Sequence, residues 1–111
     1  MATNRINKPW GYEELIELNE KYCLKKLFMK KSNRCSLQYH EKKIETIYVL
    51  DGILDIEINK KSISLQPGES VTIKAGDIHR MSAINSDALY LESSTPELED
   101  VIRLEDDFGR G

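Results

Sequence analysis

Short runs of alternating apolar and polar residues, bounded by turn residues, recur along this chain and constrain its fold more than any other feature. The strongest run is residues 46–50, which are mainly β-branched, aromatic or aliphatic and fit a strand. Asp51-Gly52 follows directly, a dipeptide that supplies the positive φ angles of a tight turn, and residues 53–58 then alternate cleanly. We therefore expect a β-hairpin over residues 46–58 that turns at Asp51-Gly52.

The other segments of the chain follow a similar pattern. Strands are expected at residues 22–29, 34–40, 62–65, 70–73 and 88–94, whereas residues 12–18 fit either a helix or a strand. Many short strands with frequent turn signals indicate an all-β fold, an antiparallel sandwich or barrel. Residues 96–111 are acidic, but Val101, Ile102 and Leu104 predict that this tail packs against the barrel at least in part. The alternative is a solvated acidic tail.

The length and charge of the chain limit its organisation and its partners. A chain of 111 residues is expected to form a single domain, residues 1–111, and to bury roughly 65% of its unfolded surface. The net charge of −3 gives no basic footprint, so nucleic acid is not expected as the main partner. No apolar run approaches the ~20 residues that span a bilayer, and the first residues lead into polar sequence without a signal peptide. These features predict a cytoplasmic protein that does not bind a membrane.

Lysine pairs and cysteines are expected to have structural roles. The pairs at residues 25–26, 30–31, 42–43 and 60–61 fit solvated strand edges or turns better than phosphate sites. Cys23 and Cys35 lack the spacing of a metal-binding pair, and a reducing cytoplasm would keep both as thiols.

The candidate functional residues lie in two short stretches, and both histidines of the chain fall within them. Residues two apart on a strand point the same way, so Gln38 and His40 would share a face, and Glu45 could reach that face from the next strand. With His79, these side chains offer the imidazole, carboxylate and amide donors that suit a divalent metal. The alternative is an ordinary strand histidine beside a surface glutamine.

The same alternation places the neighbouring side chains on the opposite face. If Gln38 and His40 point into the barrel, Leu37 and Tyr39 point outward and form an apolar outer face. Such a face needs a cover, either the N-terminal segment or a second subunit, and we expect a homodimer.

Beyond these local patterns, the spacing of residues resembles a known family. The pattern Gln38-x-His40-x4-Glu45-x6-Gly52, followed by Gly68-x5-Lys74-x-Gly76-x2-His79, resembles the two-part cupin motif. Glutamine at the first position is similar to the cupin domain of type II phosphomannose isomerases, which is often fused to mannose-1-phosphate guanylyltransferases. The stretches at residues 8–11, 36–40 and 100–110 resemble the same subgroup, so the resemblance covers nearly the whole chain.

The resemblance implies a cupin-type jelly-roll barrel of short antiparallel strands that holds one divalent metal ion (Zn, Mn, Fe, Co or Ni) through Gln38, His40, Glu45 and His79. It also implies a sugar phosphate as the small-molecule partner and an isomerase that interconverts mannose 6-phosphate and fructose 6-phosphate. Lys43 and Arg103 are the implied catalytic residues.

The sequence departs from the family pattern next to the first motif. Lys43 stands where the family has arginine, and Thr46 and Ile47 stand where it has histidine and tryptophan. Lysine keeps the positive charge but loses the planar, two-pronged guanidinium. As a residue on its own, Lys43 fits either a charge near the substrate or a solvated turn lysine. Two alternatives to the isomerase therefore stay open: a cupin of another enzymatic class (epimerase, lyase or dioxygenase), and a non-catalytic module that binds a sugar or sugar nucleotide.

Overall fold

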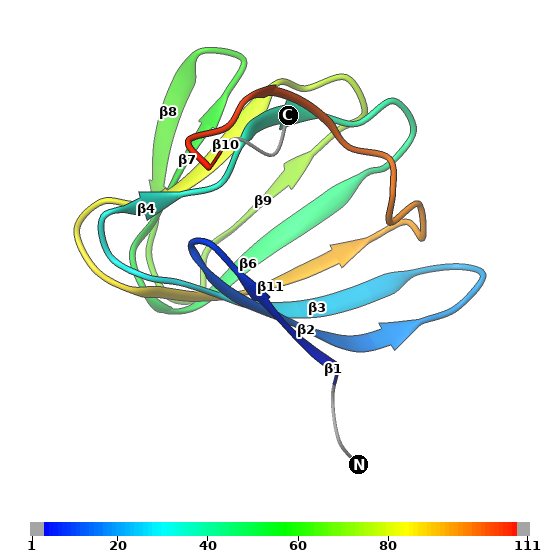
Figure 1. The fold of residues 1–111 in the computed structure, drawn as a ribbon, viewed down its shortest axis with the longest axis horizontal. Helices are drawn as coiled ribbons and strands as arrows, with labels where there is room; N and C mark the ends of the chain where they lie inside the picture. Colours follow the sequence, from blue (N-terminus) through cyan, green and yellow to red (C-terminus); the bar gives the residue numbers. More distant parts are fainter. Residues whose placement is uncertain (1–3, 109–111) are drawn as a thin grey trace.

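The computed structural model describes residues 4–108, which form strands and connecting turns without a helix (Figure 1). In chain order the strands are β1 (Asn4–Lys8), β2 (Gly11–Leu18), β3 (Cys23–Met29), β4 (Asn33–Arg34), β5 (Leu37–Tyr39), β6 (Glu45–Gly52), β7 (Leu54–Ile58), β8 (Lys61–Leu65), β9 (Ser70–Ile73), β10 (His79–Ala83), β11 (Ala88–Ser94) and β12 (Ile102–Glu105). The expected all-β fold is confirmed, and residues 12–18 lie in a strand. Within the described residues, no helix is long and apolar enough to cross a membrane.

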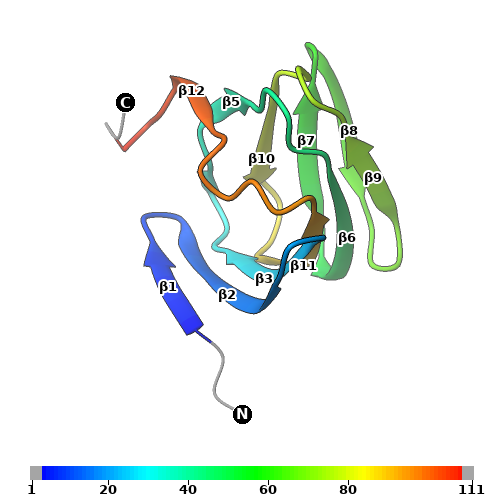
Figure 2. The same cartoon turned by 90° about the vertical axis from the view of Figure 1, so that its right-hand side faces the viewer.

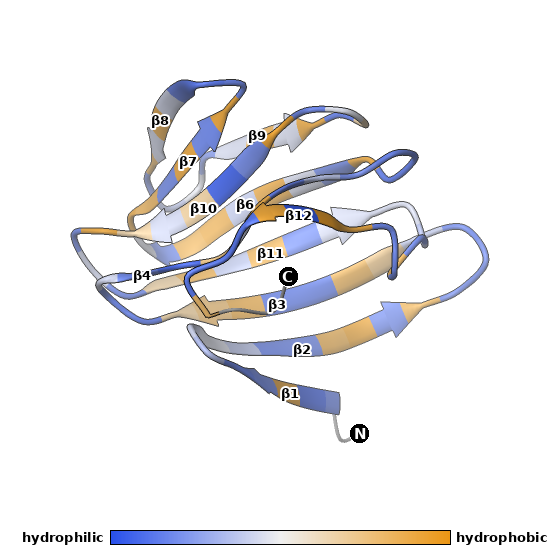
Figure 3. Ribbon diagram, turned by 45° about the horizontal axis from the view of Figure 1, so that its top comes forward, coloured by the Kyte–Doolittle hydropathy of each residue, from blue (hydrophilic) through white to orange (hydrophobic). Residues whose placement is uncertain are grey.

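Two antiparallel sheets face each other and enclose the core. The first has the strand order β1-β2-β3-β11-β6-β9, and the second has the order β12-β5-β10-β7-β8, with β4 also paired to β10. Figures 1 and 2 show the two sheets as opposite walls of a barrel. Apolar and polar residues alternate along individual strands (Figure 3), as a sheet with one buried face requires. The buried apolar side chains include Leu27, Val49, Ile56, Met81 and Tyr90, which come from both sheets.

The predicted hairpin at Asp51-Gly52 is wrong. Strand β6 pairs with β9 and β11, whereas β7 pairs with β8 and β10, so the chain passes at this point from one sheet to the other. The passage from β6 to β7 requires a glycine at position 52. The φ angle of Gly52 is +76°, and a Cβ there would lie 1.9 Å from the carbonyl oxygen of Asp87. A two-residue hairpin is found one strand later, between β7 and β8. Asn59 and Lys60 both have positive φ between β7 and β8.

The expected strand over residues 34–40 is interrupted. Cys35 and Ser36 are buried between β4 and β5, and the N–H of Cys35 donates to the carbonyl oxygen of Met81 at 3.1 Å. Both halves still pair with β10, which keeps Gln38 opposite His79. The two cysteines are free thiols and are buried, as expected.

The C-terminal segment joins the second sheet, so the alternative of a solvated tail is wrong. Strand β12 pairs with β5, with Ile102 opposite Tyr39 and Arg103 opposite Gln38. Figure 2 shows the segment after β11 running across to this strand. Val101 and Ile102 are half-buried, whereas Leu104 is 49% exposed, so the prediction for Leu104 is wrong. Residues 109–111 of the predicted tail lie outside the described residues.

Candidate metal centre and adjoining cavity

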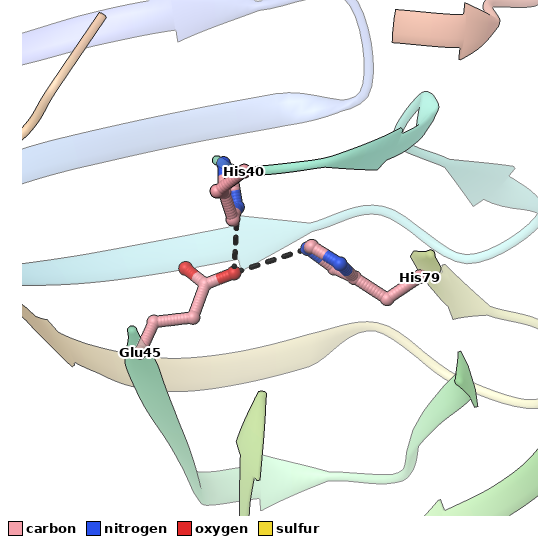
Figure 4. A group of neighbouring side chains, drawn as sticks. All are labelled: His40, Glu45 and His79. Atoms are coloured by element: carbon pink, nitrogen blue, oxygen red, sulfur yellow. Dashed lines mark hydrogen bonds and ion pairs between the residues drawn. The ribbon is translucent and has the colours of Figure 1, made fainter. Parts of the chain in front are cut away.

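Three buried side chains from different elements point toward one another inside the barrel (Figure 4). His40 follows the end of β5, Glu45 begins β6, and His79 begins β10. The Nε2 atom of each histidine lies 3.1 Å from Oε1 of Glu45. The three side chains each offer a ligand atom, and these atoms lie within 4.8 Å of one another, so His40, Glu45 and His79 could hold a metal ion.

The second ring nitrogen of each histidine is hydrogen-bonded to a backbone carbonyl oxygen. Nδ1 of His40 bonds to the carbonyl oxygen of Asp100, and Nδ1 of His79 bonds to the carbonyl oxygen of Asp77 at 2.8 Å. A carbonyl oxygen only accepts, so each Nδ1 carries the proton, and in the neutral ring Nε2 keeps a free lone pair. Both Nε2 lone pairs therefore face a carboxylate oxygen, which accepts but does not donate.

A divalent cation fits this donor set. Nε2 of His79 is buried without a hydrogen-bond partner among the described residues, although it lies close to Glu45. Burial alone would raise the pKa of Glu45, but the nearby charge of Lys43 acts in the opposite direction and favours the ionised carboxylate that a cation binds. An octahedral ion with bonds of ~2.1 Å spaces neighbouring ligands by ~3.0 Å, close to the distances from Glu45 to the imidazoles.

The predicted fourth ligand, Gln38, lies beside this cluster. It is directly opposite His79 on neighbouring strands, so the two side chains share a face of the sheet. Its Oε1 accepts a hydrogen bond from Oγ of Ser36 at 2.7 Å. A carbonyl-type oxygen has two lone pairs, so this bond leaves one of them free.

Each histidine-bearing loop is held by an aspartate. The carboxylate of Asp100 accepts hydrogen bonds from the backbone N–H groups of Glu41, Lys42 and Lys43 at 2.9, 2.7 and 2.9 Å. These three bonds lower the pKa of Asp100 to about 2. Asp77 accepts from the backbone N–H of Lys74 at 2.9 Å and from the side chain of Asn59 at 3.0 Å, which also lowers its pKa.

Lys43 is not a solvated turn lysine. Its residue is 4% exposed, and Nζ lies 3.7 Å from Oε2 of Glu45 and 3.6 Å from Oε2 of Glu92. One ammonium cannot compensate two buried carboxylates, so one of them keeps its proton at neutral pH. Burial and the charge of Glu45 raise the pKa of Glu92 to about 8, which assigns the proton to Glu92.

A cavity of about 160 Å³ adjoins the cluster through Gln38 and Lys43. Its charged lining consists of four basic side chains and two acidic ones: Lys8, Lys25, Lys43, Arg103, Glu13 and Glu92. Ion pairs link several of them across the first sheet, with Glu13 lying 3.3 Å from Lys25 and 3.9 Å from Lys8. The predicted solvated position of Lys25 is therefore wrong, because its side chain is only 13% exposed.

Arg103 and Lys43, the two implied catalytic residues, both line this cavity. Sequence reasoning missed Glu92 and Asp100 as contributors to the site. Glu92 could have been found from the sequence. It lies on the same face of the strand as Ala88 and Tyr90, so it places a carboxyl group on an otherwise buried face. Asp100 had no local signal, since its partners lie 57 to 59 residues away.

Comparison with solved structures defines the class. KdgF from Halomonas sp. superposes with a TM-score of 0.80 at 16% identity, over 87% of this chain and 89% of that one. An RmlC-like cupin from Shewanella frigidimarina superposes with a TM-score of 0.79 at 16% identity, over 88% of this chain and 87% of that one. The fold is that of a cupin.

Sequence comparison narrows the class to one family. The family model described as mannose-6-phosphate isomerase C-terminal matches residues 1–106. The mannose-1-phosphate guanylyltransferase ManC of Salmonella typhimurium is 31% identical over 109 residues, which are 95% of this chain and 23% of that protein. The chain belongs to the mannose-6-phosphate isomerase C-terminal family, and it spans about a quarter of the length of the curated relatives that it matches.

Proposed function

We propose that this cupin domain is a metal-dependent sugar-phosphate isomerase that interconverts mannose 6-phosphate and fructose 6-phosphate. The observation that carries the proposal is the pair formed by Lys43 and Glu92, 3.6 Å apart, which lines a cavity beside the cluster of His40, Glu45 and His79. A carboxyl group and an ammonium group at one cavity wall are groups that can hold and move a proton. Membership of the family supports the same reaction.

The conversion of an aldose into a ketose moves a proton between adjacent carbons and requires polarised sugar oxygens. Gln38, His40, Glu45 and His79 would hold a divalent ion, whose chemistry at such a site is to polarise oxygens and to stabilise negative charge on them. Glu92 would lose its proton more readily when the charge of Glu45 is offset by a bound cation, and its carboxylate is then placed to take a proton from one carbon and to return it to the next. Lys43 balances the charge of Glu92, and Arg103 binds and orients an anionic substrate from the opposite wall.

The test is to incubate metal-loaded protein with mannose 6-phosphate and to measure fructose 6-phosphate. We expect turnover that Glu92→Gln lowers by about 10²- to 10⁴-fold, the usual contribution of a general acid or base. Glu17→Gln, the same change on the exposed end of β2, is the matched control and should keep the rate of the unmodified protein. A rate that Glu92→Gln leaves unchanged would remove Glu92 from the reaction.

Lys43 stands where the family has arginine, so restoring the arginine is a second test, one that should raise the isomerase rate. Lys43→Arg should raise the isomerase rate a few-fold, because a guanidinium gives two parallel donors to a carboxylate or phosphate. The measurement is the same assay on folded protein of equal metal content. An unchanged or lower rate would argue against a role for a two-pronged donor at this position in the reaction.

A non-catalytic sugar-binding module is the second candidate. The observation that favours it is that the ammonium of Lys43 lies between two carboxylates, 3.7 and 3.6 Å away, so it can serve the structure rather than a substrate. Saturable binding of mannose 6-phosphate without any turnover in metal-loaded protein would select this candidate.

We also propose that the chain forms a homodimer. Leu37 and Tyr39 are half-buried, and two further apolar side chains are exposed on the outer face of β6, where Tyr48 is 42% and Leu50 is 40% exposed. Light scattering on the purified chain distinguishes a dimer from a monomer.

A further inference from the structure

Two almost wholly buried aromatic residues line the cavity, and each carries a polar atom that has no hydrogen-bond partner among the described residues. Trp10 is 5% exposed and Tyr90 is 0% exposed, and both line the cavity. Within the part of the chain that the structure describes, neither Nε1 of Trp10 nor the hydroxyl of Tyr90 makes a hydrogen bond. Nε of Arg103, which lines the same cavity, is also buried without a partner.

Three unpartnered donors around one cavity are unusual. Most buried polar groups in proteins are hydrogen-bonded, because an unsatisfied one costs about 1–3 kcal/mol. The backbone around both aromatic residues is well held: Tyr90 pairs with Val49 and Leu27, and the carbonyl oxygen of Trp10 accepts from the N–H of Lys30 at 2.9 Å. Their donor atoms are therefore held in place by the fold without a partner of their own.

The charge of the lining indicates the chemistry of that ligand. Four basic side chains and two acidic ones line the cavity, in a chain whose net charge is −3. The cavity thus concentrates positive charge that the rest of the chain lacks. An anion that also carries several oxygen acceptors matches both the basic lining and the unpartnered N–H and O–H groups.

We propose that the indole N–H of Trp10 and the hydroxyl of Tyr90 are specificity-determining donors that bind the oxygen atoms of a phosphorylated monosaccharide in this cavity. The ligand class rests on the proposed function, whereas the two donors are assigned by their burial and lack of partners. The basic side chains compensate the charge of the phosphate. Both donors act in binding and are not required to move a proton.

The chain provides its own probe for this proposal, because Trp10 is its single tryptophan. Titration of the metal-loaded protein with mannose 6-phosphate should change the Trp10 emission in a saturable way. Mannose and inorganic phosphate, each titrated alone, should bind more weakly, since each satisfies only part of the lining. No saturable change with mannose 6-phosphate in the fluorescence or by calorimetry would overturn the proposal.

Tyr90→Phe tests one donor and keeps the fluorescent probe. We expect the dissociation constant for mannose 6-phosphate to rise about tenfold, the effect of one lost hydrogen bond. The ligand-free variant should melt at the same temperature or higher, because the hydroxyl has no partner to lose. Tyr48→Phe, the same change on the exposed face of β6, should leave the dissociation constant unchanged.

Trp10→Phe tests the second donor by calorimetry, since it removes the fluorophore, and it should also weaken binding about tenfold. A Tyr90→Phe variant that melts lower but binds normally would assign the hydroxyl a structural role and overturn the proposal for Tyr90. Saturable, donor-dependent binding without turnover would support the proposal and reject the isomerase. Turnover with binding that is insensitive to both changes would support the isomerase and reject the two donors.

Discussion

The two loops that carry His40 and His79 make the same kinds of contact, but the aspartate that holds the first loop comes from a distant part of the chain, whereas the aspartate that holds the second belongs to the loop itself. In each, Nδ1 of the histidine bonds to the carbonyl oxygen of an aspartate, and the carboxylate of that aspartate accepts from the backbone N–H groups of the loop. Asp77 lies two residues from His79, whereas Asp100 lies 60 residues from His40.

The difference shows how the candidate metal centre depends on the rest of the fold. The His79 loop has a second anchor, because Asn59 accepts from the N–H of Ile78 at 3.0 Å and its own N–H donates to the carbonyl oxygen of Ile78 at 2.7 Å. In the His40 loop, the N–H groups of Glu41, Lys42 and Lys43 go to the single carboxylate of Asp100, and the N–H of Ile44 donates to Oγ1 of Thr95 at 3.0 Å. His40 therefore depends directly on the docking of the C-terminal segment, whereas the His79 loop is linked to that segment only through His40, whose carbonyl oxygen accepts from the N–H of Gly76 at 2.7 Å.

The largest expected effect is the loss of metal binding, and it is the same for both loops. His40→Ala and His79→Ala each remove one ligand, so both should abolish metal binding, seen as loss of metal in elemental analysis. A chelator should lower the melting temperature of the unmodified protein, since a ligand at a hundredfold its dissociation constant stabilises by ~2.7 kcal/mol. Neither variant should respond to the chelator. A variant that still responds would show that its histidine is not a ligand.

The second largest expected effect is a loss of metal affinity that differs between the two loops. Asp100→Asn should weaken metal affinity by about 10- to 100-fold, as changes to groups that orient metal ligands do. Asp77→Asn should weaken it less, because the bonds between Asn59 and Ile78 remain. Metal titration followed by calorimetry measures both, and Glu99→Gln, an exposed neighbour in the same segment, is the control. Equal losses in the two aspartate variants would contradict the comparison.

The smallest effect is the response of the metal-free protein to acid. The pKa of Asp100 is lowered from 3.8 to about 2, so its stabilising contribution is complete above pH 3.8 and is lost as the pH falls toward 2. Asp100→Asn should therefore flatten the fall in the free energy of unfolding between these values, as measured by urea denaturation. An identical slope in the variant and the unmodified protein would show that the three N–H bonds do not persist in solution.

Much of the candidate metal centre could be predicted from local sequence, because strand parity alone brings Gln38 and His40 to one face. The remainder depended on contacts that no local pattern encodes. The pairing of Lys43 with Glu92 joins a loop to a strand about fifty residues later, and the cavity is bounded by β1, β2, β3 and β11 on one side and by β5, β10 and β12 on the other. The misassigned hairpin has a similar origin: Asp51-Gly52 favours a turn, but whether β6 and β7 pair is decided by their other neighbours.

The sequence by itself determined many of the strands, the faces of their side chains and four candidate ligands, because the period of two and the turn residues act over a few positions. Only the tertiary structure decided that β6 and β7 belong to different sheets, that Asp100 holds the His40 loop, and that Trp10 and Tyr90 meet at one cavity. These relations join residues far apart in the chain, and their geometry follows from how two twisted sheets pack against each other.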